Sequence, residues 1–211
     1  AWGVAELLDR WRHKEKLLTT AAIIVLAVLS TISWRQITYW KNSTALFTHA
    51  LTVTQLNYFA HNALGNALKA RGQTDAALDH YYRALELRPD VAPPHYNIGH
   101  TLAQRGKQAD AIKHFQKAIQ IKPEYASAHD HLGYVFLMQG KIDQAITHFS
   151  EALRMKPDDA ELHNRLGLAW VRQGQFDQAI IHFQKAVNLK ADFAAARDNL
   201  LKAQNDMEHM D

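Results

Sequence analysis

The 211-residue chain contains no cysteine, which excludes disulfide frameworks, thiolate metal sites and cysteine nucleophiles. Most of it also lacks an excess of one charge: residues 58–211 carry 18 basic and 18 acidic side chains, and so offer no basic surface for nucleic acid. No nucleophile elbow, phosphate loop, kinase signature or dinucleotide fingerprint occurs. We therefore expect no catalysis and no cofactor in this chain, and any catalytic part would lie upstream of it.

Glycine is scarce but regularly placed. Eight of the nine glycines form two series with a period of 34 residues, offset by seven: Gly65, Gly99, Gly133 and Gly167, then Gly72, Gly106, Gly140 and Gly174. Self-similarity of this period indicates an array of one supersecondary unit that cannot bury its apolar face alone. Function is then expected on the surface of a stack and not in a single pocket.

Numbering each repeat from Tyr58, Ala92, Ala126 and Ala160 brings the other residue types into register. Large residues occupy positions 7, 11 and 24, and small ones positions 8, 20 and 27, a pattern that predicts two closely packed antiparallel helices, A and B. The glycine at position 15 is expected to end helix A as a left-handed cap. Proline at position 32 is expected to end helix B in the first three repeats; these are Pro89, Pro123 and Pro157.

These positions resemble the tetratricopeptide repeat, in which Leu and Gly at 7 and 8, aromatics at 11 and 24, Ala at 20 and 27, and Pro at 32 recur. The resemblance implies an all-α helical solenoid with four full repeats and a half repeat at each end. The repeats would span 58–91, 92–125, 126–159 and 160–193, preceded by a half repeat over 38–57 and followed by a capping helix over 194–211.

The fourth repeat departs from this pattern because Ala191 stands where proline is expected. Its helix B is therefore predicted to continue towards the last helix. At the other end, the register places Phe47 at position 24, which predicts a helix B over about Tyr39 to Thr54. In the capping helix, Leu201 replaces the small residue of position 8.

Before the repeats lies an uncharged segment from Leu17 to Trp34, within a predicted membrane-spanning helix over 17–37. A basic segment over 1–16 precedes it, and Trp34 and Trp40 are suitable interfacial anchors. The distribution of basic residues favours a cytoplasmic N-terminus and repeats outside the cytoplasm, in a periplasm or at a cell surface. A signal peptide and a helix buried against the solenoid are the two alternatives.

The junction into the repeats carries Trp40, Asn42, Ser43, Leu46 and Phe47. It resembles the C-terminal portion of multi-pass bacterial membrane proteins related to protein O-mannosyltransferases. The resemblance implies that the chain is the last membrane helix and repeat domain of such a protein, an accessory to glycosyltransferase chemistry located upstream.

Eight of the thirteen histidines form two ladders. Equivalent positions in successive repeats are separated by at least a helix-to-helix distance of ~8–10 Å, too far to share one zinc ion, so no metal site is predicted. The histidines at position 4 are expected at the edge of the core and those at position 23 on the outer face of helix B. Their protonation below ~pH 6.5 is expected to weaken the array. The two ladders are His61, His95, His129 and His163, and His80, His114, His148 and His182.

Helix A lines the concave groove in tetratricopeptide repeat proteins, and the resemblance implies that this groove binds extended peptides or helices of protein partners. The first hypothesis is therefore a membrane-tethered scaffold. The alternative is a homo-oligomer or filament in which solenoids stack end to end. The groove residues implied by the resemblance are Phe59, Asn62, Asn66, Tyr96, His100, Tyr134, Leu137, Met138, Asn164, Leu168, Val171 and Arg172.

Overall fold

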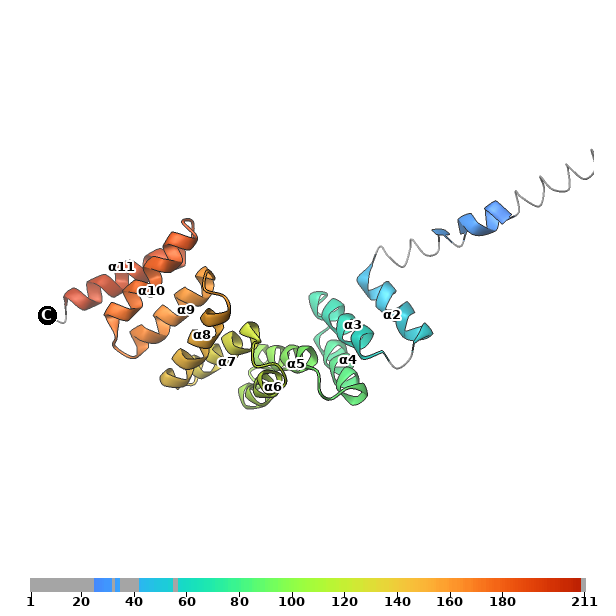
Figure 1. The fold of residues 1–211 in the computed structure, drawn as a ribbon, viewed down its shortest axis with the longest axis horizontal. Coiled ribbons are helices and arrows are strands. Elements are labelled where there is room, and N and C mark those ends of the chain that lie inside the picture. The colour runs from blue at the N-terminus through green and yellow to red at the C-terminus, as the bar shows by residue number, and fades with distance from the viewer. Residues whose placement is uncertain (1–24, 32, 35–41, 55–56, 210–211) are drawn as a thin grey trace, which may run out of the picture.

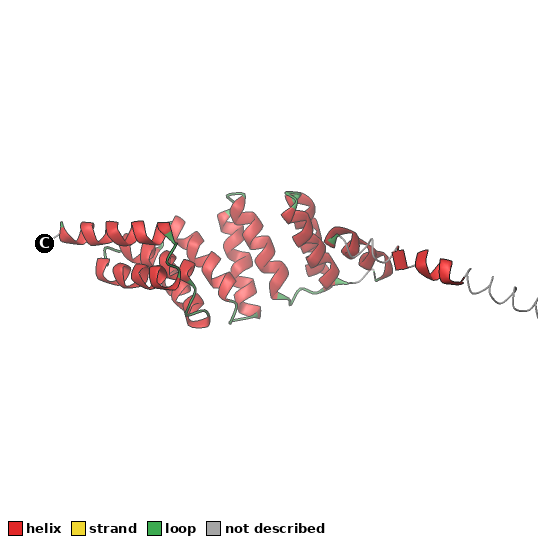
Figure 2. Cartoon of the chain, turned by 90° about the horizontal axis from the view of Figure 1, so that it is seen from above, coloured by secondary structure: helices red, strands yellow, loops and turns green. Residues whose placement is uncertain are grey.

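The computed structural model describes residues 25–31, 33–34, 42–54 and 57–209. The elements within these ranges are helices, arranged as an extended row of antiparallel pairs (Figures 1 and 2). The first helices of the four repeats, helices A, are α3 (Tyr58–Ala70), α5 (Ala92–Gln104), α7 (Ala126–Met138) and α9 (Ala160–Arg172). The second helices, helices B, are α4 (Thr74–Leu87), α6 (Gln108–Ile121), α8 (Ile142–Met155) and α10 (Phe176–Leu189).

The turn from helix A to helix B has the conformation predicted for the second glycine series. Gly140 has a φ of 74°, in the left-handed region, and the other three have φ values of 73–78°. The amide of Gly140 donates to the carbonyl of Leu137 at 3.1 Å, and that of Lys141 to the carbonyl of Phe136 at 2.9 Å. These two bonds form a Schellman motif and satisfy carbonyls that the helix end would otherwise leave unpaired.

The first glycine series lets the two helices of a repeat approach closely. A Cβ placed on Gly133 would lie 3.0 Å from ring atoms of Phe149, and one on Gly65 would lie 2.5 Å from the ring of Tyr81. The aromatic residue at position 24 is fully buried in all four repeats. Glycine at position 8 therefore makes the space that this ring fills, which confirms the predicted pairing of small and large residues.

The predicted continuation of helix B in the fourth repeat is wrong. α10 ends at Leu189, the register at which the other three helices B end, although Ala191 replaces proline. Lys190 is extended, with φ −142° and ψ 92°, and the amide of Phe193 donates to its carbonyl at 3.0 Å. The Arg197 side chain donates to the carbonyl of Ala191 at 2.6 Å. Local hydrogen bonds and the next helix therefore form this turn without proline.

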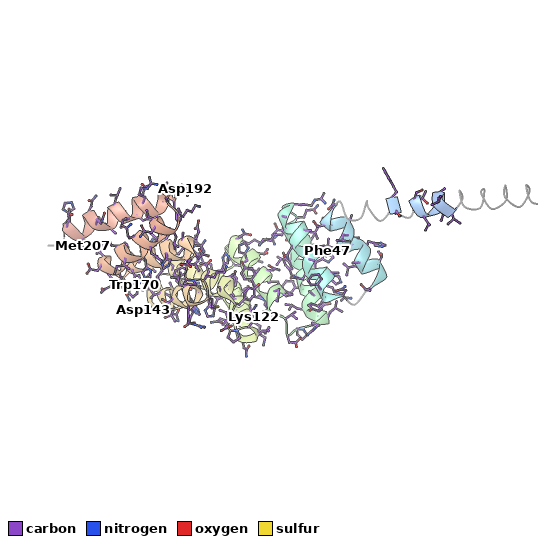
Figure 3. The ribbon with its side chains drawn as sticks, turned by 45° about the horizontal axis from the view of Figure 1, so that its top comes forward. Phe47, Lys122, Asp143, Trp170, Asp192 and Met207 are labelled. Atoms are coloured by element: carbon purple, nitrogen blue, oxygen red, sulfur yellow. The ribbon has the colours of Figure 1, made fainter. Side chains whose placement is uncertain are left out.

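Both half repeats are helical. α2 (Ser43–Val53) begins after Asn42, whose side chain accepts a hydrogen bond from the amide of Thr44, and α11 (Ala194–Glu208) ends the described chain. Residues 39–41 of the predicted first helix lie outside the described residues. Phe47 of α2 and Met207 of α11 mark opposite ends of the row (Figure 3), and the Phe47 ring contacts that of Phe59 on α3, with centroids 6.5 Å apart.

The predicted membrane-spanning segment is described only in part. Residues 25–31 and 33–34 are helical and exposed, and 17–24, 32 and 35–37 lie outside the described residues. Among the helices in the described ranges, none has both the length and the apolar character needed to span a bilayer. Val25, Leu26, Leu29 and Trp34 are each at least half exposed, so these residues do not pack against the solenoid as the buried-helix alternative requires.

Candidate functional site

The helices A form the inner face of the row. Neighbouring helices A contact each other along the array, from α3 to α5, α7, α9 and α11, whereas neighbouring helices B of the repeats make no such contacts. The row is therefore narrower on the side of helices A, which makes that side concave. This is the face on which the sequence places the groove.

Contacts between neighbouring helices A differ from one repeat to the next. Position 5 of one repeat meets position 6 of the following one. Asn97 donates to Asn62 at 2.9 Å, and Asn199 donates to Asn164 at 2.9 Å. In the second junction the rings of Tyr96 and His131 lie 5.6 Å apart. In the third, Arg165 forms an ion pair with Asp130, at 2.7 Å to each carboxylate oxygen.

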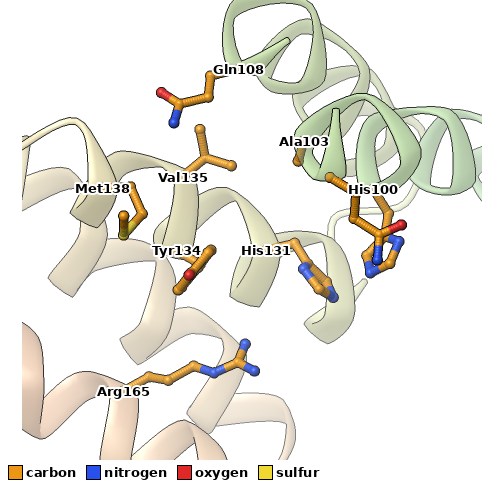
Figure 4. Close-up of a pocket in the computed structure, with 9 residues that line it drawn as sticks. His100, Ala103, Gln108, His131, Tyr134, Val135, Met138 and Arg165 are labelled. Atoms are coloured by element: carbon orange, nitrogen blue, oxygen red, sulfur yellow. The ribbon is translucent and has the colours of Figure 1, made fainter. Parts of the chain in front are cut away.

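A cavity of about 340 Å³ lies at the centre of this face. Tyr134 and Met138 project towards it from α7 and are 46% and 59% exposed. The Arg165 guanidinium lies over the Tyr134 ring, 5.8 Å from its centroid (Figure 4). The cavity thus offers exposed apolar surface on a rigid helix, next to a cation. It is lined by His100, Ala103, Gln104, Gln108, His131, Tyr134, Val135, Met138 and Arg165.

The two histidines of this cavity are held in the neutral form at pH 7. Burial lowers the pKa of His100 to about 4, with further contributions from Lys69 and His131. Burial also lowers the pKa of His131 to about 4, aided by Arg165 and Lys69. The Lys69 ammonium donates to Nδ1 of His100, and its own pKa is lowered by burial. Burial raises the pKa of Asp130, although Arg165 acts in the opposite direction.

A second cavity, of about 220 Å³, lies on the same face between α9 and α11. Leu168 and Val171 form its apolar part, and Arg172 and Lys202 supply two cations. Neither cation makes an ion pair within the part of the chain that the structure describes. The remaining lining residues are Phe183, Asn199, Ala203 and Asp206.

The structure brings about half of the implied groove residues into these two cavities. His100, Tyr134 and Met138 line the first, and Leu168, Val171 and Arg172 line the second. Others lie on the same face without lining either cavity. Phe59 is 62% exposed on α3, Asn66 accepts a hydrogen bond from the Tyr81 hydroxyl at 2.8 Å, and Asn62, Tyr96 and Asn164 make the junction contacts described above.

Leu137 is the exception, because it is buried in the core between repeats and its side chain is only 9% exposed. Several lining residues of the first cavity are absent from the groove residues that the resemblance implies, among them His131 and Arg165. Both stand at position 6, which meets position 5 of the preceding helix A, so contacts between neighbouring helices A identify them.

The histidine ladders are arranged differently from the prediction. Position 4 and position 23 of the same repeat, 19 residues apart, form a hydrogen-bonded pair, with Nδ1···Nδ1 distances of 2.9, 3.1, 3.0 and 3.0 Å in repeats 1 to 4. The histidines at position 23 are therefore partly buried against helix A, and their expected placement on the outer face is wrong. In the described ranges, no three histidine or acidic side chains are grouped so that they could hold a metal ion.

Comparisons with known proteins agree with this architecture. A family model described as TPR repeat matches residues 65–104 and 99–140, and one described as Tetratricopeptide repeat matches residues 132–199. Together they span more than half of the chain, which therefore belongs to the tetratricopeptide repeat family. A comparison with curated proteins found no match.

Three solved structures show the same fold at low sequence identity. A crystal structure of MamA is 24% identical, with a TM-score of 0.65 over 76% of this chain and 94% of that one. MamA from residue 41 onwards, from Desulfovibrio magneticus RS-1, is 22% identical, with a TM-score of 0.63 over 72% and 92%. The APC/C hetero-tetramer Cut9–Hcn1 is 21% identical, with a TM-score of 0.70 over 75% of this chain and 32% of the matched chain. These likenesses support the solenoid fold alone.

Proposed function

We propose that this protein is a scaffold that binds a protein partner on its inner face. The observation that carries the proposal is the central cavity, where Tyr134 and Met138 are exposed side by side with Arg165. Large apolar and aromatic side chains that remain exposed on a rigid surface are typical of binding sites. The repeat fold is generally a non-catalytic scaffold, which agrees with this role.

The two cavities together define the chemistry of the partner. An apolar side chain would fill the space between Tyr134 and Met138. Because His100 and His131 are neutral there, its binding would not have to desolvate a charged imidazole. An acidic side chain or a carboxyl terminus would pair with Arg172 and Lys202 in the second cavity. The partner is therefore a peptide or helix that combines an apolar anchor with a negative charge.

A related arrangement is known in one of the similar folds, because Cut9 occurs in a hetero-tetramer with Hcn1. That solenoid therefore assembles with a second protein. This supports a binding role for the present chain, and the residues above supply the specific site.

The proposal can be tested without knowing the partner, by selecting peptides from a random library on the immobilised full chain. Peptides that bind should carry an apolar and an acidic residue, and should lose at least about tenfold in affinity with the Tyr134→Ala, Met138→Ala double variant. Ile181→Ala is the matched control, since Ile181 is 60% exposed on α10, a helix B. Peptides that bind the groove variant as tightly as the natural chain would refute the groove.

We further propose that the segment from Leu17 to Trp34 tethers the solenoid to a membrane and holds the repeats on its outer side. The support is its apolar sequence and the basic residues before it. In this arrangement the solenoid would be an accessory of a membrane glycosyltransferase, as the junction sequence suggests. Membrane flotation of the full chain beside a chain without residues 1–37 tests the tether, and flotation of both would contradict it.

End-to-end self-assembly has less support. In a repeat, glycine at position 8 leaves room for the aromatic ring of helix B, whereas α11 carries Leu201 there, 56% exposed. A second copy that docked α2 on α11 in the repeat register would bring Phe47 against Leu201. A filament therefore requires a different contact, and a monomer in size-exclusion chromatography of the full chain would exclude it.

A further inference from the structure

The four histidine pairs form a repeated structure that the groove does not use. Each pair joins helix A to helix B of one repeat, next to the aromatic residue at position 24. The same contact appears four times, with Nδ1···Nδ1 distances between 2.9 and 3.1 Å. One physical interaction between the two imidazoles therefore recurs in every repeat.

A shared metal ion does not fit the ring geometry. The centroids of the paired rings are 5.2–5.4 Å apart, which equals the N···N distance plus the centre-to-nitrogen distance of each ring. The two nitrogens therefore lie on the line between the rings and point at each other. Ligands of one ion would instead point to a common atom about 2.0–2.1 Å from each nitrogen. At the observed N···N distances of 2.9–3.1 Å, this arrangement would bring the ring centroids closer together than they are. The geometry is that of an N–H···N hydrogen bond.

A third group fixes which ring donates. In repeats 2 to 4, Nε2 of the position-4 histidine lies 3.3, 3.1 and 3.0 Å from the carbonyl of the proline that ends the preceding helix B. A carbonyl only accepts, so this Nε2 carries the hydrogen and the neutral ring has a bare Nδ1. The position-23 histidine must therefore donate its Nδ1–H. Each of these three pairs thus connects the end of one repeat to both helices of the next.

The number of protons decides whether this bond can form. With both rings neutral, position 23 donates to position 4. With one ring charged, the charged ring can still donate to a bare Nδ1 on its partner. With both rings charged, two N–H groups face each other at about 3 Å and two positive charges repel. We propose that the histidine pairs are a proton-operated clamp, which closes every repeat at neutral pH and releases helix A from helix B when acid protonates both rings.

The surroundings of the pairs give little compensation for a second charge. The charged neighbours of the first pair are Asp79, Arg83 and Glu86. The second pair lies near Asp110, Lys113 and Lys117 and contacts the ring of Tyr82. The third pair lies near Glu151 and contacts the ring of Phe136. In the fourth pair the largest influence on His182 after burial is His163 itself.

The direction of the pKa shifts sets the pH range. Burial lowers the pKa of His61, His80, His95 and His114, and lowers the pKa of His148 and His182 to about 4. The unfolded chain, with an ordinary histidine pKa of about 6.5, then binds protons before the folded chain does. The stability supplied by the pairs is therefore complete above about pH 6.5 and is lost as the pH falls towards about 4.

Asparagine at position 23 separates the clamp from other effects of acid. Its amide nitrogen stands where Nδ1 stands in histidine, can donate to the neutral ring of position 4, and does not titrate; after an amide flip its oxygen can accept from the charged ring. The test variant carries His114→Asn, His148→Asn and His182→Asn in the full chain. His209→Asn is the matched control, because His209 is exposed beyond the end of α11.

Thermal unfolding is measured at pH 7.5 and pH 4.5. We expect the Tm of the natural chain and of the control to fall by roughly 10 °C or more, and that of the triple variant by less than half as much. An equal fall in the triple variant, or no fall in the natural chain, would overturn the proposal.

Long-range ¹H–¹⁵N spectra of the natural chain at pH 7.5 test the same bond without a substitution. The clamp requires the Nδ1–H tautomer for His114, His148 and His182, and the Nε2–H tautomer for their partners. The Nε2–H tautomer at position 23 would overturn it, whatever the stability of the variant.

Discussion

Two of the interfaces in this solenoid differ, because the contacts of only one of them are the same in every repeat. Between helix A and helix B of a repeat, the same contacts occur four times: a glycine under an aromatic ring and a pair of histidines. Between neighbouring helices A, the contacts change from an amide pair to an aromatic pair, an ion pair and again an amide pair. The first interface therefore holds each repeat together in the same way, and the second differs from one junction to the next.

The difference follows from what each interface must do. The interface within a repeat closes a unit that cannot bury its apolar face alone, so the same steric solution serves every repeat. The junctions between helices A also form the floor of the groove, where Arg165 both pairs with Asp130 and covers Tyr134. Under the proposed function, a change there alters binding as well as stability. We therefore expect substitutions in the two interfaces to differ in kind.

The largest effect is expected for Gly133→Leu, in the repeated interface. The new side chain would collide with Phe149, since a Cβ alone would lie 3.0 Å from its ring. Overpacking of this kind costs roughly 1–3 kcal/mol or more. Urea unfolding followed by circular dichroism measures it, and a variant as stable as the natural chain would mean that the helix register is wrong.

A smaller effect is expected for Asp130→Ala, in the variable interface. The change leaves the Arg165 guanidinium, 30% exposed in its side chain, without its carboxylate. Because this pair is only partly buried, we expect a loss of about 1–2 kcal/mol, less than for a fully buried pair. The double variant Asp130→Ala, Arg165→Ala should recover part of it. Equal losses in the single and double variants would show that the two side chains are not coupled.

Gly140→Ala measures the cost of backbone strain without any steric collision of the new side chain. A Cβ on Gly140 meets no atom within 4 Å, so the only cost is the positive φ of 74°. We expect a loss of about 1 kcal/mol. The same substitution at Gly133 adds a contact with Phe149 but no backbone strain, so the two alanine variants measured together compare the roles of the two glycine series. Unchanged stability of Gly140→Ala would argue against a strained turn.

The repeats could be predicted from the sequence alone, because the residues that end the helices recur at the same positions. Gly72 and its equivalents end helix A as predicted. Contacts between side chains of different helices could not be predicted in this way. The histidine ladders were compared along the array, from one repeat to the next, whereas His129 meets His148 within a single repeat. Ala191 misled for a related reason, since local hydrogen bonds and a contact from the next helix end α10 without proline.

The groove was only partly predictable from sequence. Position in the repeat indicates which residues face inwards, and two of those implied by the resemblance, Tyr134 and Met138, line the first cavity. It does not show which of them are covered by the next helix. Leu137 is covered, and Arg165 extends from the following repeat into the cavity. Such details depend on how far each pair of helices is rotated against the next.

Tyr134→Ala gives the most direct test, because Tyr134 follows Gly133 in α7 but faces the groove. The account predicts that the free energy of unfolding changes by no more than about 0.5 kcal/mol, as for a surface residue. It also predicts that the affinity for a library-selected peptide, measured by calorimetry, falls at least about tenfold. Unchanged affinity, or a loss of stability as large as that of Gly133→Leu, would contradict the division between a repeated interior and a variable binding face.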